Sequence, residues 1–342
     1  MVSKAITVFE VILPVNNSLI AFPVKRDDKT SVITSGIINE KFTARLFSVM
    51  PYFSHGSIGI FLTFLIAGCS INSTASQQPL SQVSPTTASP HYQVFELPHS
   101  RVYTLRIPAQ NSVELAVSPT LATLPQFAKE SQAIAVLNAG YFDPQNQKTT
   151  AYLTVQGKPV GDPTSNPHLM NNPKLQSYLP QILNRSEFRR YLCDQKTQYA
   201  IAFHQDPIPS HCQLIDAVGG GPRLLPELTG TQEAFWQEDQ GQVVRDAIGL
   251  KQRNARTAIA IFPTGDLLWV MAAQKPESPQ NSGLSLAELA KFLQSQGVKD
   301  ALNLDGGSSS ALYYHGQTES GKFNEQGQPI LRPVKSVLFV RK

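Results

Sequence analysis

The chain has 342 residues, which is enough for one large domain or two small ones. Hydrophobic residues make up 41% of it and charged residues 16%, so it can bury a sizeable core. The formal net charge is +4, from 29 basic and 25 acidic side chains. Residues 1–68 hold six basic and four acidic side chains, which leaves 23 and 21, a net of +2, for the rest. That near balance of charges gives no indication of a basic surface for binding nucleic acid.

A short apolar run near the N-terminal end is typical of an export signal. Residues 58–68 ("IGIFLTFLIAG") form 11 apolar or small residues, too few for a bilayer that needs about 20. Lys41 and Arg45 precede the run as a thin basic region. The run ends in "IAGC" at Cys69, which resembles the lipobox of bacterial lipoproteins, where the signal is cut before a cysteine whose thiol carries lipid.

The segment after Cys69 favours this interpretation over a short buried helix with a chance cysteine. Residues 70–90 carry no charge and are rich in Ser, Thr, Gln and Pro, a composition suited to a flexible tether. Met50 lies nearer to the run than Met1 does, so translation could begin there, and no function is assigned to residues 1–49. We predict an N-terminal extension and signal peptide (1–68), a lipidated cysteine and tether (69–91), and an exported domain (92–342) lipid-anchored to the bacterial cell envelope.

The other two cysteines, Cys193 and Cys212, stand 19 positions apart in the exported domain. An even pair in an oxidising compartment predicts one disulfide. The alternative is two free buried thiols.

The exported domain begins with short alternating segments that predict strands. A short helix over 125–132 leads into a continuous apolar strand at 133–137, and a hairpin is expected across 156–159. Residues 162–178 read as a loop. Residues 182–192 predict an amphipathic helix whose basic face, from Arg185, Arg189 and Arg190, is interpreted as solvated. The predicted strands are 93–97, 102–107, 113–117, 133–137, 151–155, 199–203, 214–218, 257–262, 267–272 and 334–340.

The clearest helix covers residues 285–296. Ser285 and Glu288 form a capping box, an apolar stripe repeats at helical spacing, and Gly297 stops the helix. Strands outnumber helices. The sequence therefore predicts an α+β fold, a single domain with a mainly antiparallel or mixed sheet core, a few flanking helices and a site at strand ends.

Four apolar runs end abruptly in glycine or a polar side chain, at 138–142, 219–224, 253–257 and 303–310. Glycines let a backbone approach a ligand, successive N–H groups bind anions, and hydroxyls and arginine suit phosphate. Each run also has a simpler interpretation: Gly219–Gly221 as a turn, Asn138 as a loop cap, Arg256 as the partner of a surface acid. Together they predict a site for a ligand with hydroxyls and negative charge.

Other chemistries find little support. The sequence has no G-x-S-x-G, H-E-x-x-H or G-x-x-x-x-G-K-[ST] motif. Its seven histidines are scattered, so we expect no metal ion and no cofactor. His315 could stand at a site rim, although an ordinary strand-end histidine is the simpler interpretation.

The motifs "LNAGYF", "GGGPRLL", "RTAIAI" and "LNLDGGSSSAL", in that order, resemble the phosphodiester glycosidase family over residues 95–342. That family includes an animal enzyme that removes N-acetylglucosamine from a phosphodiester on mannose 6-phosphate. Ser308 and Ala260 stand where members often have glycine, so the substrate could differ. The resemblance implies hydrolysis of a sugar 1-phosphodiester.

The chemistry of such a bond assigns roles to the motif residues. Asp305 would be the nucleophile or general base, and Arg256 would clamp the leaving phosphate, because negative charge grows there as the bond breaks. Asn138 and Tyr141 would orient oxygens. Asp143 and Asp216 are candidates for a second carboxylate, and whether the reaction inverts or retains stays open. The backbone of Gly306–Ser308 and the hydroxyls of Ser308 and Ser309 would help Arg256 to bind the phosphate. The substrate-binding set is Tyr141, Gly220, Gly221, Thr257, Gly306, Gly307, Ser308 and Ser309.

Two alternatives remain beside the envelope-tethered phosphodiester glycosidase. One is a glycosidase acting on an unphosphorylated exopolysaccharide or wall glycan. The other is a lipoprotein that binds envelope glycan or a partner protein without turnover. All three carry a membrane anchor and none involves nucleic acid.

Overall fold

The computed structural model describes residues 9–15, 18–24 and 89–341. The chain divides into two compact units, residues 1–78 and 79–342, each described by itself. In the first, β1 (Phe9–Val15) and β2 (Ser18–Val24) pair as an antiparallel hairpin. The apolar run 58–68, Cys69 and nearly all of the tether lie outside the described residues. Within the described ranges, no helix has the length and apolar character needed to cross a membrane.

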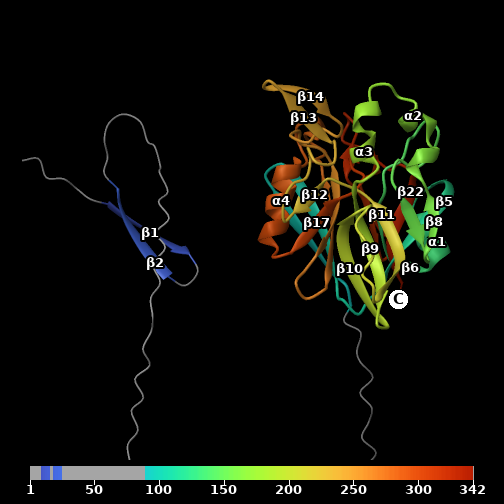
Figure 1. Cartoon of the computed structure of the whole chain (residues 1–342), viewed down its shortest axis with the longest axis horizontal. Helices are drawn as coiled ribbons and strands as arrows, with labels where there is room; N and C mark the ends of the chain where they lie inside the picture. The colour runs from blue at the N-terminus through green and yellow to red at the C-terminus, as the bar shows by residue number, and fades with distance from the viewer. Residues whose placement is uncertain (1–8, 16–17, 25–88, 342) are drawn as a thin grey trace, which may run out of the picture. The chain divides into compact units, whose positions relative to one another are not determined.

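Three sheets, antiparallel throughout, build the second unit (Figure 1). The six-stranded sheet has the order β12-β17-β15-β16-β4-β3, and the five-stranded sheets have the orders β10-β9-β11-β7-β8 and β19-β18-β6-β22-β5. The predicted α+β class is confirmed, with antiparallel rather than mixed pairing in the described sheets.

The strands of the six-stranded sheet are β3 (His91–Leu97), β4 (Ser100–Ile107), β12 (Arg223–Leu225), β15 (Arg256–Ile261), β16 (Leu267–Ala273) and β17 (Asp300–Asn303). One five-stranded sheet contains β7 (Leu153–Val155), β8 (Lys158–Gly161), β9 (Ser186–Cys193), β10 (Lys196–Phe203) and β11 (Cys212–Gly219). The other contains β5 (Val113–Ala122), β6 (Ala133–Asn138), β18 (Ala311–Tyr314), β19 (Gln317–Ser320) and β22 (Val334–Arg341). Two small hairpins are β13 (Trp236–Asp239) with β14 (Gln242–Asp246), and β20 (Lys322–Phe323) with β21 (Pro329–Ile330).

The main core lies where the inner faces of all three sheets meet. Trp269 and Ile259 of the six-stranded sheet, Val218 of β11 and Leu338 of β22 belong to one buried cluster. β15 and β16 are buried along their whole length because a second cluster covers their other face. Their continuous apolar runs follow from burial on both faces.

Two capped helices cover the outer faces. α1 (Leu124–Ser131) begins at a capping box formed by Thr123 and Gln126, and packs on the β5–β6–β22 sheet. α4 (Leu286–Ser295) begins at the predicted capping box of Ser285 and covers the six-stranded sheet. The other described helices are short: α2 (Pro167–Met170), α3 (Leu179–Ile182) and the 3-10 turns Pro163–Ser165, Gln176–Tyr178, Pro279–Asn281 and Gly307–Ser309. Several of these turns occupy the segment 162–178 predicted as loop.

The predicted helix over 182–192 is wrong. α3 ends at Ile182, and β9 pairs with both β10 and β11. Arg189 is buried rather than solvated, because its guanidinium donates to Glu187 at 2.9 Å and to the backbone carbonyls of Phe203 and His204 at 2.7 Å each. The two carbonyls lie close to Arg189 in space but far along the chain. The local pattern of basic residues therefore misled the prediction.

The predicted disulfide is confirmed. Cys193 and Cys212 are register partners on the neighbouring strands β9 and β11, 19 positions apart in the sequence. The bond closes the loop that contains β10 and so restricts the unfolded chain.

Replacing both Cys193 and Cys212 by alanine should lower the free energy of unfolding by about 3 kcal/mol, the value expected for a loop of this length. Urea denaturation of the two proteins would measure it. Dithiothreitol should reproduce the loss in the wild type and change nothing in the double variant. Equal stability of the two proteins would show that the bond does not constrain the domain.

Candidate active site

The four motifs meet where strands of all three sheets end. Asn303 is the last residue of β17 and Arg256 the first of β15, and these antiparallel neighbours bring the two ends together. Asn138 ends β6 and Gly219 ends β11. The predicted gathering of the motifs at strand ends is therefore seen in the fold.

Backbone hydrogen bonds join these ends directly. The Asp305 N–H donates to the Ala139 carbonyl at 2.9 Å, and the Leu304 N–H donates to the Thr257 carbonyl at 2.8 Å. The Gly221 N–H donates to the Asn303 carbonyl at 2.8 Å. The chain entering the turn after β17 is thus fixed by β6, β15 and the glycine segment at once.

Asn138 is fully buried, and all of its polar atoms are used inside the protein. Its Nδ2 donates to the Asp305 carbonyl at 2.6 Å, while its Oδ1 accepts from the Thr257 hydroxyl at 2.8 Å and from the Ala311 N–H at 3.1 Å. Asn138 and Thr257 therefore hold the Asp305 turn in place. The sequence placed both residues in contact with the ligand, and the geometry suits them to positioning.

A cavity of about 240 Å³ opens beside this turn. Charged, aromatic and amide side chains line it together with two glycines. The lining residues are Tyr141, Ile248, Asn254, Arg256, Asn303, Asp305, Gly306 and Gly307. Residues from three of the four motifs thus face one space.

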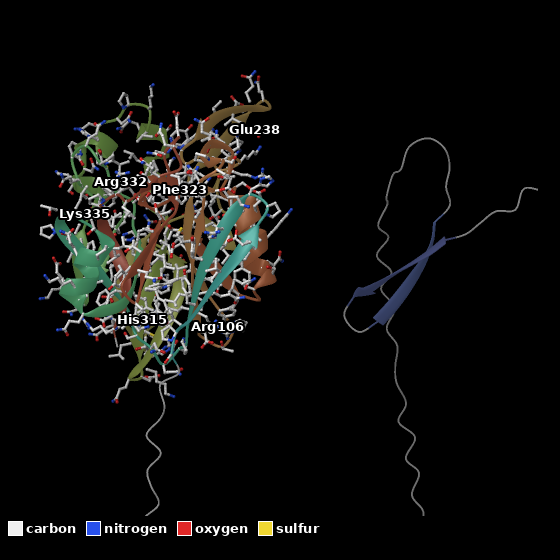
Figure 2. The ribbon with its side chains drawn as sticks, turned by 180° about the vertical axis from the view of Figure 1, so that it is seen from behind. Arg106, Glu238, His315, Phe323, Arg332 and Lys335 are labelled. Atoms are coloured by element: carbon white, nitrogen blue, oxygen red, sulfur yellow. A yellow bond between two sulfur atoms is a disulfide. The ribbon has the colours of Figure 1, made fainter. Side chains whose placement is uncertain are left out.

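Burial raises the pKa of the Asp305 carboxyl to about 6, and it does so against three opposing influences. The Ser309 hydroxyl, the charge of Arg332 and the Gly306 N–H each favour the ionised form. Arg332, labelled in Figure 2, belongs to the segment before β22 and was not among the predicted site residues. A pKa near 6 leaves the carboxyl mostly ionised at neutral pH yet able to exchange a proton.

Tyr141 and Asn303 form a hydrogen-bonded pair in the cavity wall. The Tyr141 hydroxyl donates to the Gly221 carbonyl at 2.8 Å and accepts from Asn303 Nδ2 at 2.7 Å. Burial and the charge of Asp305 raise the pKa of Tyr141, so it stays a neutral phenol. Asn303 lies in a quoted motif but was not predicted as a site residue.

Two buried polar atoms near the cavity have no hydrogen-bond partner within the described part of the chain. They are Asn303 Oδ1 and the Ser309 hydroxyl, on residues that are each about 1% exposed. Buried polar groups in native proteins are nearly always paired. An acceptor and a hydroxyl left over at one site indicate a place for a polar ligand.

Arg256 is nearly saturated by its own fold. Its guanidinium donates to the carbonyls of Ile248, Gly249, Gln252 and Leu284 over 2.6–3.0 Å. These contacts occupy almost all of its N–H donors, and burial lowers its pKa. Its role as the phosphate clamp stays a prediction. Its hydrogen bonds show that it holds the loop 248–252 in place before β15.

Gly220 and Gly221 allow the sheets to approach. A Cβ on Gly220 would clash with the Asn303 carbonyl, and one on Gly221, whose φ is +107°, would clash with the Glu233 carboxylate. Gly220 also lines a narrow pocket with Tyr141, Arg185 and Glu187. Close packing explains both glycines, whichever ligand the site takes.

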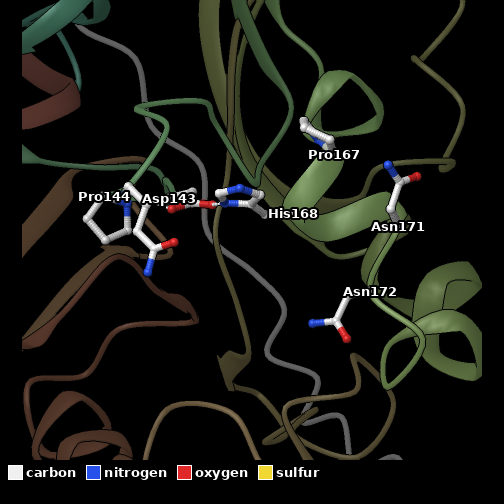
Figure 3. A pocket seen from close by; sticks show the side chains of 7 residues that line it. Asp143, Pro144, Pro167, His168, Asn171 and Asn172 are labelled. Atoms are coloured by element: carbon white, nitrogen blue, oxygen red, sulfur yellow. Dashed lines mark hydrogen bonds and ion pairs between the residues drawn. The ribbon is translucent and has the colours of Figure 1, made fainter.

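The two predicted candidates for a second carboxylate do not line the Asp305 cavity. Asp143 pairs with His168 at 2.7 Å in a separate open cleft of about 620 Å³ (Figure 3). Asp216 accepts from Arg190 at 2.7 Å within the sheet of β9 and β11.

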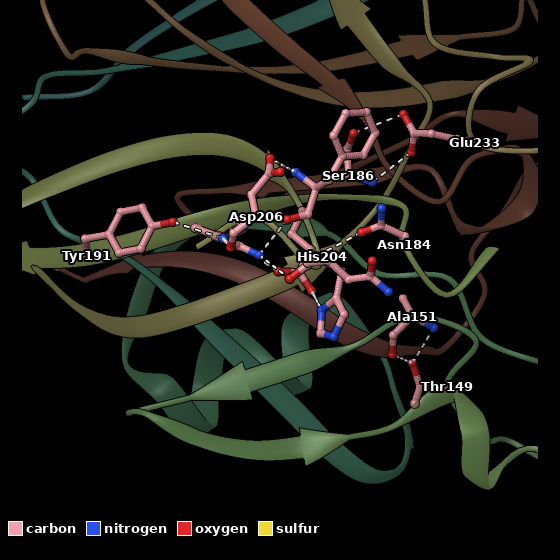
Figure 4. Close-up of polar contacts among 12 residues, drawn as sticks. Thr149, Ala151, Asn184, Ser186, Tyr191, His204, Asp206 and Glu233 are labelled. Atoms are coloured by element: carbon pink, nitrogen blue, oxygen red, sulfur yellow. Dashed lines mark hydrogen bonds and ion pairs between the residues drawn. The ribbon is translucent and has the colours of Figure 1, made fainter. Parts of the chain in front are cut away.

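Sequence reasoning missed two buried glutamates beside the motifs: Glu187 lines the narrow pocket with Tyr141, and Glu233 lies against Gly221. Figure 4 shows Glu233 with Ser186. Glu233 accepts from the Ser186 N–H at 2.8 Å and the Arg223 N–H at 2.9 Å. Glu187 accepts from Arg189 and, at 2.6 Å, pairs with His204. Neither follows an apolar run ending in glycine, so the sequence carried no signal for them.

Among residues 89–341, no histidine or cysteine lines the Asp305 cavity. His315 follows β18 and lines a different cavity with Tyr92 and Tyr314, so it is not at the rim of the Asp305 cavity. The one close group of such side chains in the described ranges is Cys193, His211 and Cys212, whose two sulfurs form the disulfide.

A family model described as phosphodiester glycosidase matches residues 131–341, which contain all four motifs. The catalytic domain of zebrafish N-acetylglucosamine-1-phosphodiester alpha-N-acetylglucosaminidase, auto-inhibited by its pro-peptide, is similar with a TM-score of 0.57 and 17% identity, over 76% of this chain and 85% of that one. A Burkholderia pseudomallei protein has a TM-score of 0.50 and 14% identity, over 71% and 74%. At these identities the structural likeness shows a shared fold. No curated protein matches the sequence.

Asp305→Asn should make the folded protein more stable at high pH. The pKa of about 6 in the folded state exceeds the unfolded value of about 3.9, so the ionised carboxylate opposes folding by about 3 kcal/mol once pH rises through 6. We expect a gain of about 1–3 kcal/mol at pH 8 that disappears towards pH 4. Urea denaturation at both pH values measures it.

Asp300→Asn is the control, because Asp300 pairs with Lys299 at the first residue of β17, away from the turn that carries Asp305. It should give no such gain. An Asp305→Asn protein equal to or weaker than the wild type at pH 8 would contradict the costly burial of this charge.

Proposed function

Because the chain belongs to the phosphodiester glycosidase family, we propose that it hydrolyses the bond between a sugar of the N-acetylglucosamine type and a phosphodiester. The observation that carries this proposal is the Asp305 carboxyl. It is held at a polar cavity, with its pKa raised to about 6 by burial. A carboxyl with such a pKa suits proton transfer or nucleophilic attack near neutral pH.

The bond that breaks joins C1 of the sugar to a phosphate oxygen. The electron pair leaves with that oxygen, so a phosphate monoester departs while C1 gains oxocarbenium character. The ionised Asp305 either attacks C1 or takes a proton from the water that attacks it. If Asp305 attacks, the Asp305–C1 ester that forms is cleaved in a second step by water, which restores the carboxylate. On either route the water hydroxyl ends on C1, and its other proton ends on a carboxylate or in solvent.

The surroundings of Asp305 fit a polar, anionic substrate. The unpaired Asn303 Oδ1 can accept from a sugar hydroxyl, and the Ser309 hydroxyl can donate to a phosphate oxygen. Arg256 and Arg332 supply positive charge around the same carboxyl. Preorganised donors and charges of this kind stabilise a leaving group whose negative charge grows in the transition state.

We further propose that the enzyme is exported and held at the cell envelope by lipid on Cys69. The support is the apolar run that ends in "IAGC" and the uncharged Ser-, Thr- and Pro-rich tether behind it. A disulfide in the domain is consistent with an oxidising compartment.

Asp305→Asn should lower kcat for release of free sugar from a sugar 1-phosphodiester, such as UDP-N-acetylglucosamine, by about 10²- to 10⁴-fold. In the wild type, kcat/KM should fall as pH drops below about 6, because the ionised carboxylate reacts. Asp300→Asn, at the start of β17, should keep wild-type kinetics. Full activity in Asp305→Asn would remove Asp305 from the reaction.

Cys69→Ser should release the full-length protein from the membrane fraction of a bacterial host, since a serine cannot carry the thioether-linked lipid. Labelling with a fatty acid should mark the wild type and leave the variant unmarked. Cys193→Ala, which keeps Cys69, should remain in the membrane fraction. An unlabelled wild type would end the lipoprotein proposal and leave the reaction untouched.

A further inference from the structure

Arg332 is a half-buried cation whose hydrogen-bonding capacity is largely unused. Its only hydrogen-bond partner among the described residues is the Ser308 hydroxyl, to which Nη1 donates at 3.1 Å. No carboxylate in the described ranges forms an ion pair with it. A guanidinium kept partly from water without a carboxylate partner indicates an anion that binds from outside.

The guanidinium is also held in a defined orientation. It stacks over the Phe142 ring, with 4.7 Å between its central carbon and the ring centroid. Phe142 directly follows Tyr141, whose ring lines the Asp305 cavity. Stacking on one face and a hydrogen bond at one end leave the other N–H groups in a fixed plane, as bidentate phosphate binding requires.

The neighbours of Arg332 lie on the turn that carries Asp305. Ser308 and Ser309 belong to the 3-10 turn Gly307–Ser309, immediately after Asp305. The Ser309 hydroxyl is buried beside the Asp305 carboxyl, whose ionised form it favours, and it has no other partner within the described part of the chain. The positive charge of Arg332 reaches Asp305 and favours its ionised form. An anion held by Arg332 and these hydroxyls would therefore lie next to the reacting carboxylate.

The backbone of the same turn offers less than its glycines suggest. The Gly307 N–H donates to the Ala255 carbonyl at 2.9 Å, and the Ser309 N–H donates to the Gly306 carbonyl at 3.2 Å. Since Arg256 is also occupied by carbonyls, it and this backbone have little capacity left for phosphate. From the predicted phosphate-binding groups, the hydroxyls of Ser308 and Ser309 remain.

We propose that Arg332, with the hydroxyls of Ser308 and Ser309, forms the binding site for the phosphoryl group of the substrate. This inference rests on the proposed function and assigns its leaving-group site. As the C1–O bond breaks, the developing phosphate monoester gains negative charge against a guanidinium that Phe142 has already oriented. Arg256 then holds the loops, and Arg332 meets the ligand.

The test is calorimetric titration of the full-length protein with inorganic phosphate, beside kinetics on UDP-N-acetylglucosamine. Arg332→Gln should weaken phosphate binding at least about tenfold and lower kcat/KM for the diester by about 10²-fold or more, the loss typical of removing one group that stabilises developing charge. Arg332→Lys, which keeps the charge but loses the planar fork, should fall between the two.

Arg106→Gln is the matched control. Arg106 also stacks on a phenylalanine, with 4.3 Å to the Phe262 centroid, and pairs with Asp266. Figure 2 shows it at the opposite end of the domain from Arg332. The same loss of charge and stacking there should change neither phosphate affinity nor turnover.

The outcomes separate the inference from the function on which it rests. Diester turnover by the wild type with unchanged phosphate affinity in Arg332→Gln would overturn the inference and keep the function. Arg332-dependent phosphate binding without any diester turnover would keep the anion site and overturn the function. A wild type that binds no phosphate would overturn the inference outright. If Arg332→Gln fails to fold, the Lys variant decides by the same criteria.

Discussion

One buried amide fixes the geometry on which the site depends. The Asn138 side chain bonds to the Asp305 carbonyl, the Thr257 hydroxyl and the Ala311 N–H, and so ties the end of β6 to the turn after β17, to β15 and to the start of β18. A buried amide left with an unpaired oxygen or nitrogen is costly, so this arrangement admits little displacement. The strands that Asn138 joins come from two sheets that share one hydrophobic core. The packing of that core therefore also fixes the position of Asp305.

That constraint explains how a carboxyl can be kept where its charge is unfavourable. Burial raises the pKa of Asp305, and the Arg332 charge with the Ser309 hydroxyl offsets only part of the effect. A loop free to move would turn the carboxylate towards water and restore its ordinary pKa. The backbone bond from Asp305 to Ala139 and the Asn138 bond at its carbonyl prevent this. The fold thus gives up some stability to hold a reactive group partly withdrawn from water, a trade common at active sites.

Local signals were sufficient for the parts of the fold that local contacts determine. The sequence correctly predicted the capping box of Ser285 and Glu288 and the strand 133–137, because both depend on residues close together in the chain. It also predicted the disulfide, because the exported domain has just two cysteines. β9 was mistaken for a helix because its arginines find partners that are distant in sequence: Arg189 donates to the carbonyls of Phe203 and His204, and Arg190 pairs with Asp216 of β11. No local window of sequence contains these partners. The motif glycines located the site, whereas Arg332 and Glu233 reach it from segments without any motif.

The arginines show why proximity to a motif is a poor guide to function. Arg256 lies inside a motif and lines the cavity, yet four backbone carbonyls take up its donors. Arg185 stacks on Phe235 with 3.6 Å to the ring centroid and donates to the Glu233 carbonyl, which supports the wall behind Gly221. Arg332 lies outside every motif, and its single hydrogen bond among the described residues goes to the Ser308 hydroxyl. A cation can bind a ligand only with donors that the fold has not already used, so the distribution of hydrogen bonds assigns these three identical side chains to different tasks.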